Sequence, residues 1–391
     1  MEFVQEDLRL LAGMTDETGV LSVYVTADPR QESTTRPAWQ VRVENGLAAL
    51  RERARTELPR ERRTVLEKRL QQLGPSLHSL VQASRPGLGR ALFAPVSDGE
   101  VRTVEIQMPL PDVVTLEPSA HIRPLAAAAN AGAPAGVAAV GREGLRLLDL
   151  RFGRAREVRA TDFTIEFEDW RRSGGPASGN PSSGQQNVSQ VDRFHNRLED
   201  RLGRLLSAAT SDVVRHTTEQ GWQYLVVSGE RRLVEMLADR LPEMHGTDVV
   251  RLSQVLHPLS PAKVAEAVGP ALAEARQRRE QRLVEKVMDA ALSGGTGTCG
   301  LSDTLGSLNE GRVAHLLIDG EKEWPGSRAR DGRLFPEGER APDGPETDPE
   351  PELGERMIER ALLEGAEVTV LAPESAPRLA GTDGVAALLR W

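Results

Sequence analysis

The sequence changes character abruptly at Asp192, where a long polar segment gives way to a patterned helix. Residues 172–190 are mostly Gly, Ser, Asn, Pro and Gln, which bury too little apolar area to offset the entropy of ordering the chain. After Asp192, a good N-cap residue, apolar side chains recur at helical spacing. They are Phe194, Leu198, Leu202 and Leu205. We therefore expect a mobile loop over 172–190 that leads into a basic helix over 192–206.

A second row of residues on the same predicted helix is basic. It consists of Arg193, Arg197, Arg201 and Arg204. An arginine row at this spacing can neutralise phosphates and so bind RNA. Gly184, beside Gln185, would let the preceding loop approach a ligand closely, because glycine has no Cβ atom. The alternative is a solvated helix face on which Glu199 and Asp200 screen the arginines, and the residues alone leave both interpretations open.

Length and composition indicate a soluble globular protein. A chain of 391 residues with 39% hydrophobic and 27% charged residues is long enough for two or three domains. Without a long apolar run or an export signal at its beginning, it is expected in the cytoplasm, with no membrane partner. The single cysteine, Cys299, excludes a disulfide framework and a multi-cysteine zinc site. The histidines lack metal-ligand spacing, so we expect no metal and no cofactor.

The charge balance restricts contact with nucleic acids. A net charge of −9 argues against DNA as a partner and against a generally cationic RNA binder, so any RNA contact must be local. Besides the arginine row, residues 51–69 carry eight basic residues against four glutamates. Because aromatic residues make up only 4% of the chain, base stacking is not expected, and recognition of shape or phosphate remains.

The first 130 residues have the pattern of a small α+β domain. Apolar and polar residues alternate from Leu21 to Val25, as in a half-buried strand, and helices are predicted over 38–57 and 60–83. Short strand patterns follow at 90–94 and 101–107. The Ala/Gly run at 126–136 marks the expected boundary of this domain.

A central α/β domain is predicted over residues 131–257. Two strand patterns at 136–141 and 144–153 are joined by the turn composition Gly-Arg-Glu-Gly, and a buried strand follows at 222–230. The polar loop and the basic helix lie between them.

A third α/β domain is predicted over residues 258–391. It opens with a long helix and contains a buried strand at 313–319 and a helix at 355–364. Residues 320–354 are rich in Pro, Gly and acidic residues and lack periodicity, which predicts a disordered acidic insertion.

Three stretches together resemble the archaeo-eukaryotic peptide release factor and Pelota family, in its bacterial branch. The third domain carries the family's pattern in the segments Gly300-Leu301, Gly311-Arg312-Val313 and Leu316-Leu317-Ile318. A further match is the segment Gly-Val-Ala-Ala-Leu-Leu-Arg at 384–390. In the middle domain, the strand pair, the loop, the helix and the segment Leu-Val-Val-Ser-Gly-Glu at 225–230 resemble the domain that carries the family's Gly-Gly-Gln loop. The N-terminal segment Val-Leu-Ser-Val-Tyr-Val-Thr-Ala-Asp-Pro at 20–29 resembles the bacterial branch.

The resemblance implies a three-domain, tRNA-mimicking architecture of mixed sheets flanked by helices. It also implies binding in the ribosomal A site, with the loop reaching the peptidyl-transferase centre and its rRNA, and it suggests an elongation-factor GTPase as a further partner. In the family's catalytic members the Gly-Gly-Gln loop positions a water molecule and stabilises the oxyanion during hydrolysis of peptidyl-tRNA. By this resemblance the candidate catalytic residues are Gly184, Gln185 and Gln186.

The loop departs from that motif in two ways. Serine replaces the first glycine at position 183, and Gln185 lies eight residues before Arg193, farther than in catalytic members. Gly174-Gly175 is followed by proline. Three hypotheses follow: a factor that occupies idle or stalled ribosomes in hibernation or rescue, without efficient catalysis; a peptidyl-tRNA hydrolase that releases nascent chains; and a non-ribosomal scaffold whose acidic insertion recruits a protein.

Overall fold

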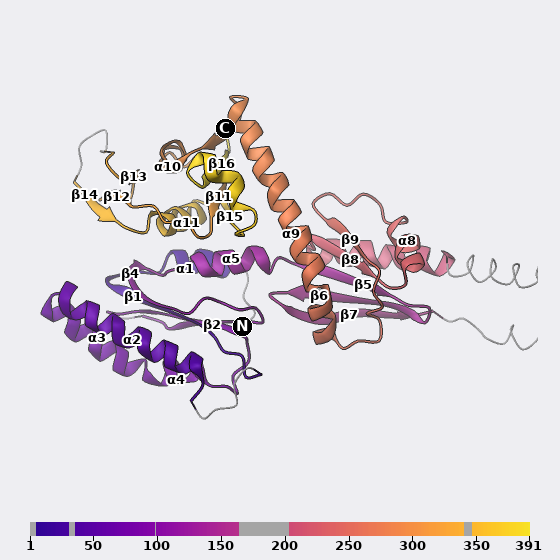
Figure 1. The fold of residues 1–391 in the computed structure, drawn as a ribbon, viewed down its shortest axis with the longest axis horizontal. Coiled ribbons are helices and arrows are strands. Elements are labelled where there is room, and N and C mark those ends of the chain that lie inside the picture. The colour runs from indigo at the N-terminus through magenta and orange to yellow at the C-terminus, as the bar shows by residue number, and fades with distance from the viewer. Residues whose placement is uncertain (1–4, 31–35, 98, 164–202, 340–345) are drawn as a thin grey trace, which may run out of the picture. The chain divides into compact units, whose positions relative to one another are not determined.

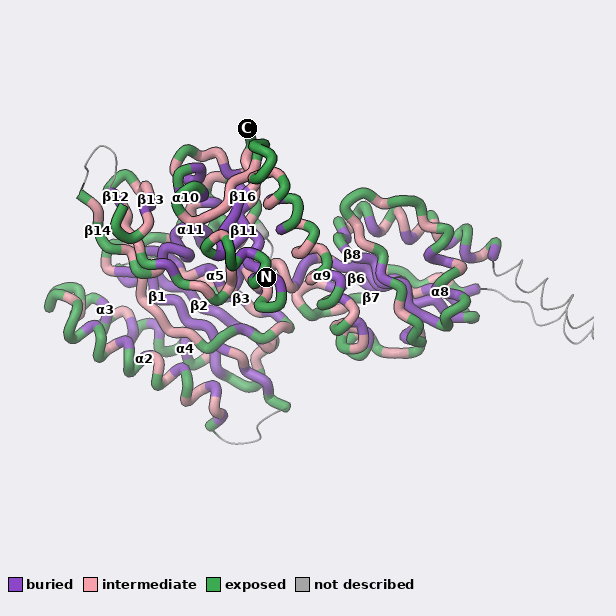
Figure 2. The backbone as a smooth tube through the Cα atoms, turned by 45° about the horizontal axis from the view of Figure 1, so that its top comes forward, coloured by how far each residue is buried: buried purple, intermediate pink, exposed green. Residues whose placement is uncertain are grey.

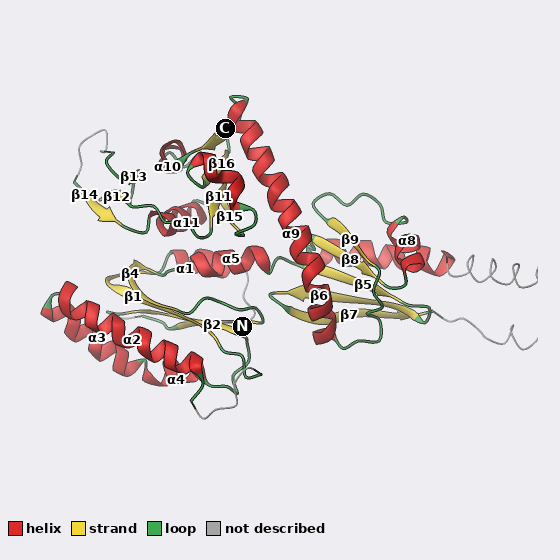
Figure 3. Ribbon diagram, in the orientation of Figure 1, coloured by secondary structure: helices red, strands yellow, loops and turns green. Residues whose placement is uncertain are grey.

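The structure, a computed structural model, describes residues 5–30, 36–97, 99–163, 203–339 and 346–391 (Figure 1). The chain forms two compact units. The first unit combines Met1–Gly132 with Arg276–Trp391, and the second is Ala133–Ala275. The long helix α9 (Pro261–Leu292) contributes to both, since the division falls within it. Mixed sheets flanked by helices occur in both units, which confirms the predicted fold class (Figure 3).

The first unit begins with an antiparallel four-stranded sheet of order β3-β2-β1-β4. Its strands are β1 (Thr15–Thr26), β2 (Gly89–Pro95), β3 (Arg102–Ile106) and β4 (Val113–Ser119). Leu21, Val23 and Val25 share one face of β1, as their alternation predicts, and lie in a core with the helices α2 (Ala38–Glu57), α3 (Arg60–Gln72) and α4 (Gly74–Val81). The helix predicted over 60–83 is thus two helices, because Gly74 and Pro75 interrupt it.

A second sheet in the same unit is mixed, with the order β10-β16-β11-β15. Its strands are β10 (Gly297–Cys299), β11 (Val313–Asp319), β15 (Glu367–Leu371) and β16 (Val385–Leu389). β11 pairs in parallel with β15 and antiparallel with β16. Four helices and one 3-10 helix complete this part of the unit: α1 (Gln5–Ala12), α5 (Arg123–Ala131), α10 (Leu301–Asn309), α11 (Leu353–Leu363) and η1 (Ala376–Thr382). α5 packs against β15, and α1 packs against α11.

The prediction of a disordered insertion over 320–354 is wrong for the described residues. This segment forms a three-stranded antiparallel sheet, β13 (Leu334–Pro336), β12 (Gly326–Ala329) and β14 (Thr347–Glu350), while residues 340–345 lie outside the described residues. Trp324, Leu334 and Phe335 are buried there. The side chain of Asn309 both donates to the carbonyl of Leu334 (2.8 Å) and accepts from its amide (3.0 Å). A few well-placed apolar residues therefore order a segment whose average composition suggests disorder.

The second unit contains one five-stranded mixed sheet of order β7-β6-β5-β8-β9. Its strands are β5 (Ala135–Val140), β6 (Gly144–Arg151), β7 (Arg154–Asp162), β8 (Tyr224–Ser228) and β9 (Asp248–Leu252). The predicted hairpin turn joins β5 to β6, with the amide of Gly141 donating to the carbonyl of Gly144 (2.8 Å). β5, β8 and β9 are parallel.

Both faces of this sheet are covered, and its strands are largely buried (Figure 2). On one face, Val264, Val268 and Leu272 of α9 complete the core. On the other, a helix at residues 203–220 and α8 (Arg231–Ala238) contribute apolar residues. Among the described residues, no helix combines the length and the apolar character that crossing a membrane would require.

Candidate functional site

The residues predicted to act in catalysis, Gly184, Gln185 and Gln186, lie outside the described residues. The same holds for Arg193, Arg197 and Arg201. The flanks of this segment are described. Phe163 at its beginning and Leu206 after its end lie in the same buried cluster of the second unit. The two ends of the segment are therefore held on one face of the central sheet.

Arg204 is the member of the predicted arginine row that the structure describes. It is exposed near the beginning of the helix at 203–220 and forms no ion pair within the described part of the chain. Arg240 lies beside it, because its Nε donates to Ser207 Oγ (3.3 Å), one turn along the helix from Arg204. Arg240 is also exposed and, in the described ranges, has no carboxylate partner. Together Arg204 and Arg240 form what we call the arginine pair.

Several other arginines of the second unit are neutralised locally. Arg215, on the same helix as Arg204, pairs with Asp212 (2.6 Å), and Arg231 pairs with Glu235 (2.9 Å). The arginine pair therefore differs from these arginines by carrying uncompensated positive charge close to the point where the described structure resumes after residues 164–202. Such a site can hold phosphate oxygens through charge-assisted hydrogen bonds.

The core near these residues contains a buried polar network. Trp222 is buried, and its Nε1 donates to the carboxylate of Asp149 on β6 (2.7 Å). Arg151 pairs with the same carboxylate (3.1 Å) and donates to the carbonyl of Gln220, at the end of the helix that the structure describes from residue 203. Asp149 thus ties β6 to the start of β8 and to the helix that carries Arg204.

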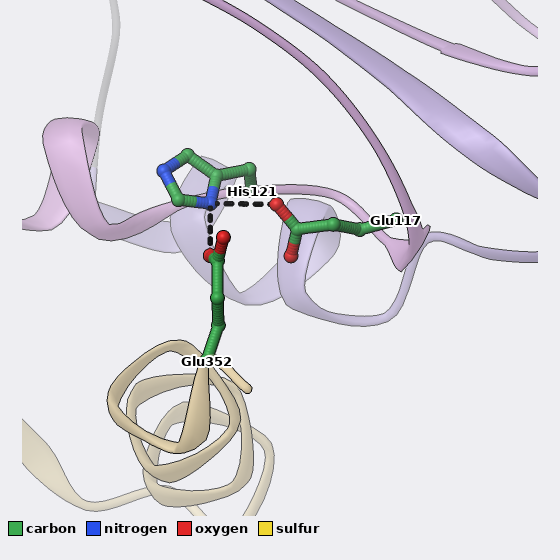
Figure 4. Close-up of side chains that lie close together, drawn as sticks. All are labelled: Glu117, His121 and Glu352. Carbon is green, nitrogen blue, oxygen red and sulfur yellow. Dashed lines mark ion pairs between the residues drawn. The ribbon is translucent and has the colours of Figure 1, made fainter. Parts of the chain in front are cut away.

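A second polar cluster, in the first unit, was not predicted from the sequence. It joins the end of β4 to the start of α11, residues that are more than 200 positions apart (Figure 4). His121 Nδ1 lies 3.0 Å from Glu117 Oε1 and 3.5 Å from Glu352 Oε2. The buried Glu355 also lies 3.5 Å from it and accepts a hydrogen bond from the amide of Arg123 (3.1 Å). We call this group the His121 cluster.

The cluster is balanced by a buried arginine. Arg356 pairs with Glu117 and Glu359, and Glu359 also accepts from Ser119 Oγ (2.7 Å). Burial alone would lower the pKa of His121. Its hydrogen bond to Glu117 and the charges of Glu355, Glu117 and Glu352 outweigh burial and raise that pKa to about 9. His121 is therefore protonated at neutral pH, and the cluster is a network of ion pairs.

Glu117, His121 and Glu352 offer three atoms close enough together to hold a metal ion. With a His121 pKa of about 9, the proton must first leave Nδ1, which costs roughly 3 kcal/mol at pH 7. Arg356 also already occupies Glu117. The geometry therefore supports ion pairing within the fold better than metal binding.

Comparison with known families finds a match for the central part of the chain. Residues 121–272, which include all of the second unit except its last three residues, match the model of the bacterial archaeo-eukaryotic release factor family 10. This part of the chain is therefore similar to the bacterial branch of the archaeo-eukaryotic release factor family, which its sequence motifs also resemble. No curated protein matches the chain.

Among solved structures, the chain is similar to the archaeal translation termination factor aRF1, with 16% identity over 100% of this chain and 99% of that one and a TM-score of 0.26. Archaeoglobus fulgidus Pelota is 16% identical over 78% and 79% of the two chains, with a TM-score of 0.33. A ribosome-bound archaeal Pelota is 14% identical over 100% and 95%, with a TM-score of 0.40. These likenesses are too distant to carry an argument about function.

Proposed function

We propose that this protein is a translation factor that binds the ribosomal A site of idle or stalled ribosomes, in hibernation or rescue, without efficient catalysis. The match of residues 121–272 to the release factor family carries the proposal. The arginine pair supports it, because two exposed, uncompensated guanidinium groups at the base of the predicted loop suit contact with rRNA phosphates. A translation GTPase as delivery partner stays a prediction from the family resemblance.

The alternative is a peptidyl-tRNA hydrolase that uses Gln185 or Gln186. Gly184 beside Gln185 favours it, and the serine at position 183 argues against it. The scaffold hypothesis has lost part of its basis, because the insertion expected to recruit a partner as a disordered segment is folded over 326–339 and 346–354.

The decisive experiment is co-sedimentation with 70S ribosomes combined with release of labelled peptide from ribosomes stalled with peptidyl-tRNA. We expect the protein to pellet with ribosomes and to release little peptide. Release that depends on Gln185, tested with Gln185→Ala, would make the protein a hydrolase. Failure to pellet at moderate salt would refute ribosome binding altogether.

The arginine pair gives the binding assay a matched control. We expect Arg204→Glu/Arg240→Glu to weaken ribosome binding in the pelleting assay about tenfold. The slope of log affinity against log salt concentration should become shallower by about two, because two phosphate contacts are lost. The control Arg215→Glu/Arg231→Glu changes the charge of the same unit equally, but removes arginines that are already paired. Equal effects of the two variants would show that the arginine pair has no special role.

A further inference from the structure

A groove between α2 and α3 is lined by ten residues, five of which are basic. Its volume is about 560 Å³. The charged residues that line it are Arg51, Arg55, Arg60, Arg63, Lys68 and a single acidic residue, Glu67. Ala54 and Leu66 also line it and are buried, at 7% and 1% exposure, so the apolar part of the groove is its floor.

The sequence builds this groove through the way in which the two helices pack. α2 and α3 turn their apolar faces toward the sheet, and Pro59 between them reverses the chain. Arg51 and Arg55 are four residues apart on α2 and therefore share one face, as Arg60 and Arg63 do on α3. The two basic faces border each other because their helices pack side by side on the same sheet.

The charge of the groove is only partly neutralised. Arg55 pairs with Glu52 (3.0 Å), but both side chains are largely exposed, so solvent screens this pair. Arg60 and Lys68 are exposed and form no ion pair within the ranges that the structure describes. Arg51 reaches Glu67 at only 3.4 Å, and both side chains are more than a third exposed, so this pair stabilises little. Eight basic residues against four glutamates give residues 51–69 a net charge of +4, whereas the whole chain carries −9. A concentrated cationic surface on an acidic protein indicates an anionic ligand.

We propose that the groove between α2 and α3 binds the phosphate backbone of RNA. The inference rests on the proposed function and assigns the first unit its own rRNA contact, separate from the arginine pair. Guanidinium groups hold phosphate oxygens through paired hydrogen bonds. No aromatic residue lines the groove, so base stacking is absent and binding is independent of sequence.

RNA explains the groove better than an acidic protein segment does. Protein interfaces concentrate their binding energy in apolar or aromatic anchors that fill pockets. The apolar residues of this groove, Ala54 and Leu66, are already covered by the fold and offer little surface for such an anchor. Binding here depends on charge alone, as in contacts with a nucleic acid backbone.

The test compares two double variants of the full chain on the same two helices. Arg60→Glu/Lys68→Glu removes cations that line the groove, and Arg53→Glu/Arg62→Glu makes the same change of charge at exposed positions outside it. Neither pair of side chains makes an ion pair in the described structure. Affinity for a labelled RNA hairpin is measured by fluorescence anisotropy between 50 and about 200 mM salt, and pelleting with 70S ribosomes is measured in parallel.

We expect the groove variant to bind the hairpin at least about tenfold more weakly, and the slope of its log affinity against log salt concentration to become shallower by about two. The control variant should lose no more than about threefold in hairpin affinity. Equal losses in both variants, or no loss in either, overturn the inference. Thermal melting of both variants shows that they fold, and Arg60→Gln/Lys68→Gln, which only removes the charges, must lower affinity in the same direction.

The two readouts separate this inference from the proposed function. If the wild type pellets with ribosomes and the groove variant behaves like the control in both assays, ribosome binding stands and the groove contact is refuted. If the groove variant alone loses the hairpin while no variant pellets with ribosomes, the groove binds RNA and the proposed function fails. A labelled polyglutamate peptide that binds the groove more tightly than the hairpin would assign it to a protein partner and overturn the inference.

Discussion

The His121 cluster predicts a specific loss of stability in mild alkali. The folded protein holds the pKa of His121 at about 9, against 6.5 for an ordinary histidine, because Glu117, Glu355 and Glu352 stabilise the protonated ring. A raised pKa contributes stability that is fully present below pH 6.5 and is lost as the pH rises through 9. The difference between these two pKa values corresponds to about 3 kcal/mol of unfolding free energy. Roughly 2.5 kcal/mol of this contribution remains at pH 7, and almost none remains at pH 10.

The assay is urea unfolding of the wild type and of His121→Gln at intervals from pH 6 to pH 10. Glutamine keeps a donor near Glu117 but does not titrate, so the difference in unfolding free energy between the two proteins should fall by about 2.5 kcal/mol between pH 7 and pH 10. Groups common to both proteins, including Tyr24, whose pKa burial raises well above its usual value, cancel in this difference.

His315→Gln is the matched control. Burial lowers the pKa of His315, so this residue does not titrate above pH 7 and its variant should run parallel to the wild type there. If the curves of the wild type and His121→Gln are also parallel between pH 7 and pH 10, His121 is not held protonated by its carboxylates and the reasoning is refuted.

Two further substitutions test the packing around the described sites. Arg356→Met should destabilise the first unit by about 3–5 kcal/mol, because it leaves the buried carboxylate of Glu359 without a cation and Glu117 with His121 alone; a cost below about 1 kcal/mol in urea unfolding would contradict that assignment. Gly136→Ala should cost about 1–3 kcal/mol or more, since the added Cβ would lie 2.1 Å from the ring of Trp222; an unchanged melting temperature would show that this contact relaxes freely.

The helices and strands that the sequence predicts best are those whose pattern is visible within a few neighbouring residues. The helix expected over 38–57 and the buried strand around residues 224–228 occur at or near their predicted bounds, because helical spacing and a short apolar run are visible in a few neighbouring residues. β7 was missed, because this edge strand has the sequence Arg-Ala-Arg-Glu-Val-Arg-Ala-Thr-Asp and buries none of its residues fully. The insertion was missed because its order depends on contacts from elsewhere, such as those of Asn309.

Of the functional features, the basic character of residues 51–69 could be predicted, but the groove could not, because it requires the packing of two helices against each other. The His121 cluster gave no signal at all. Its members come from residues 117–121 and 350–359, and neither segment has a motif. Only the fold brings them together, and a histidine beside one glutamate is unremarkable until two more carboxylates approach it.

The His121 cluster also determines how the chain can be divided. The first predicted domain, residues 1–130, contains Glu117, Ser119 and His121, whereas Arg356 and Glu359 belong to the third. In the structure both segments lie in one compact unit, from which the chain departs at Gly132 and to which it returns at Arg276. Glu355 accepts hydrogen bonds from the backbone amides of Ile122 and Arg123 at the start of α5. A fragment that ends at residue 130 would lose this acceptor, and it would also lose Arg356, the cation that pairs with Glu117. The groove between α2 and α3 must therefore be studied in the full chain, because β4 of the sheet that supports it carries Glu117, which pairs with Arg356 from the other end of the sequence.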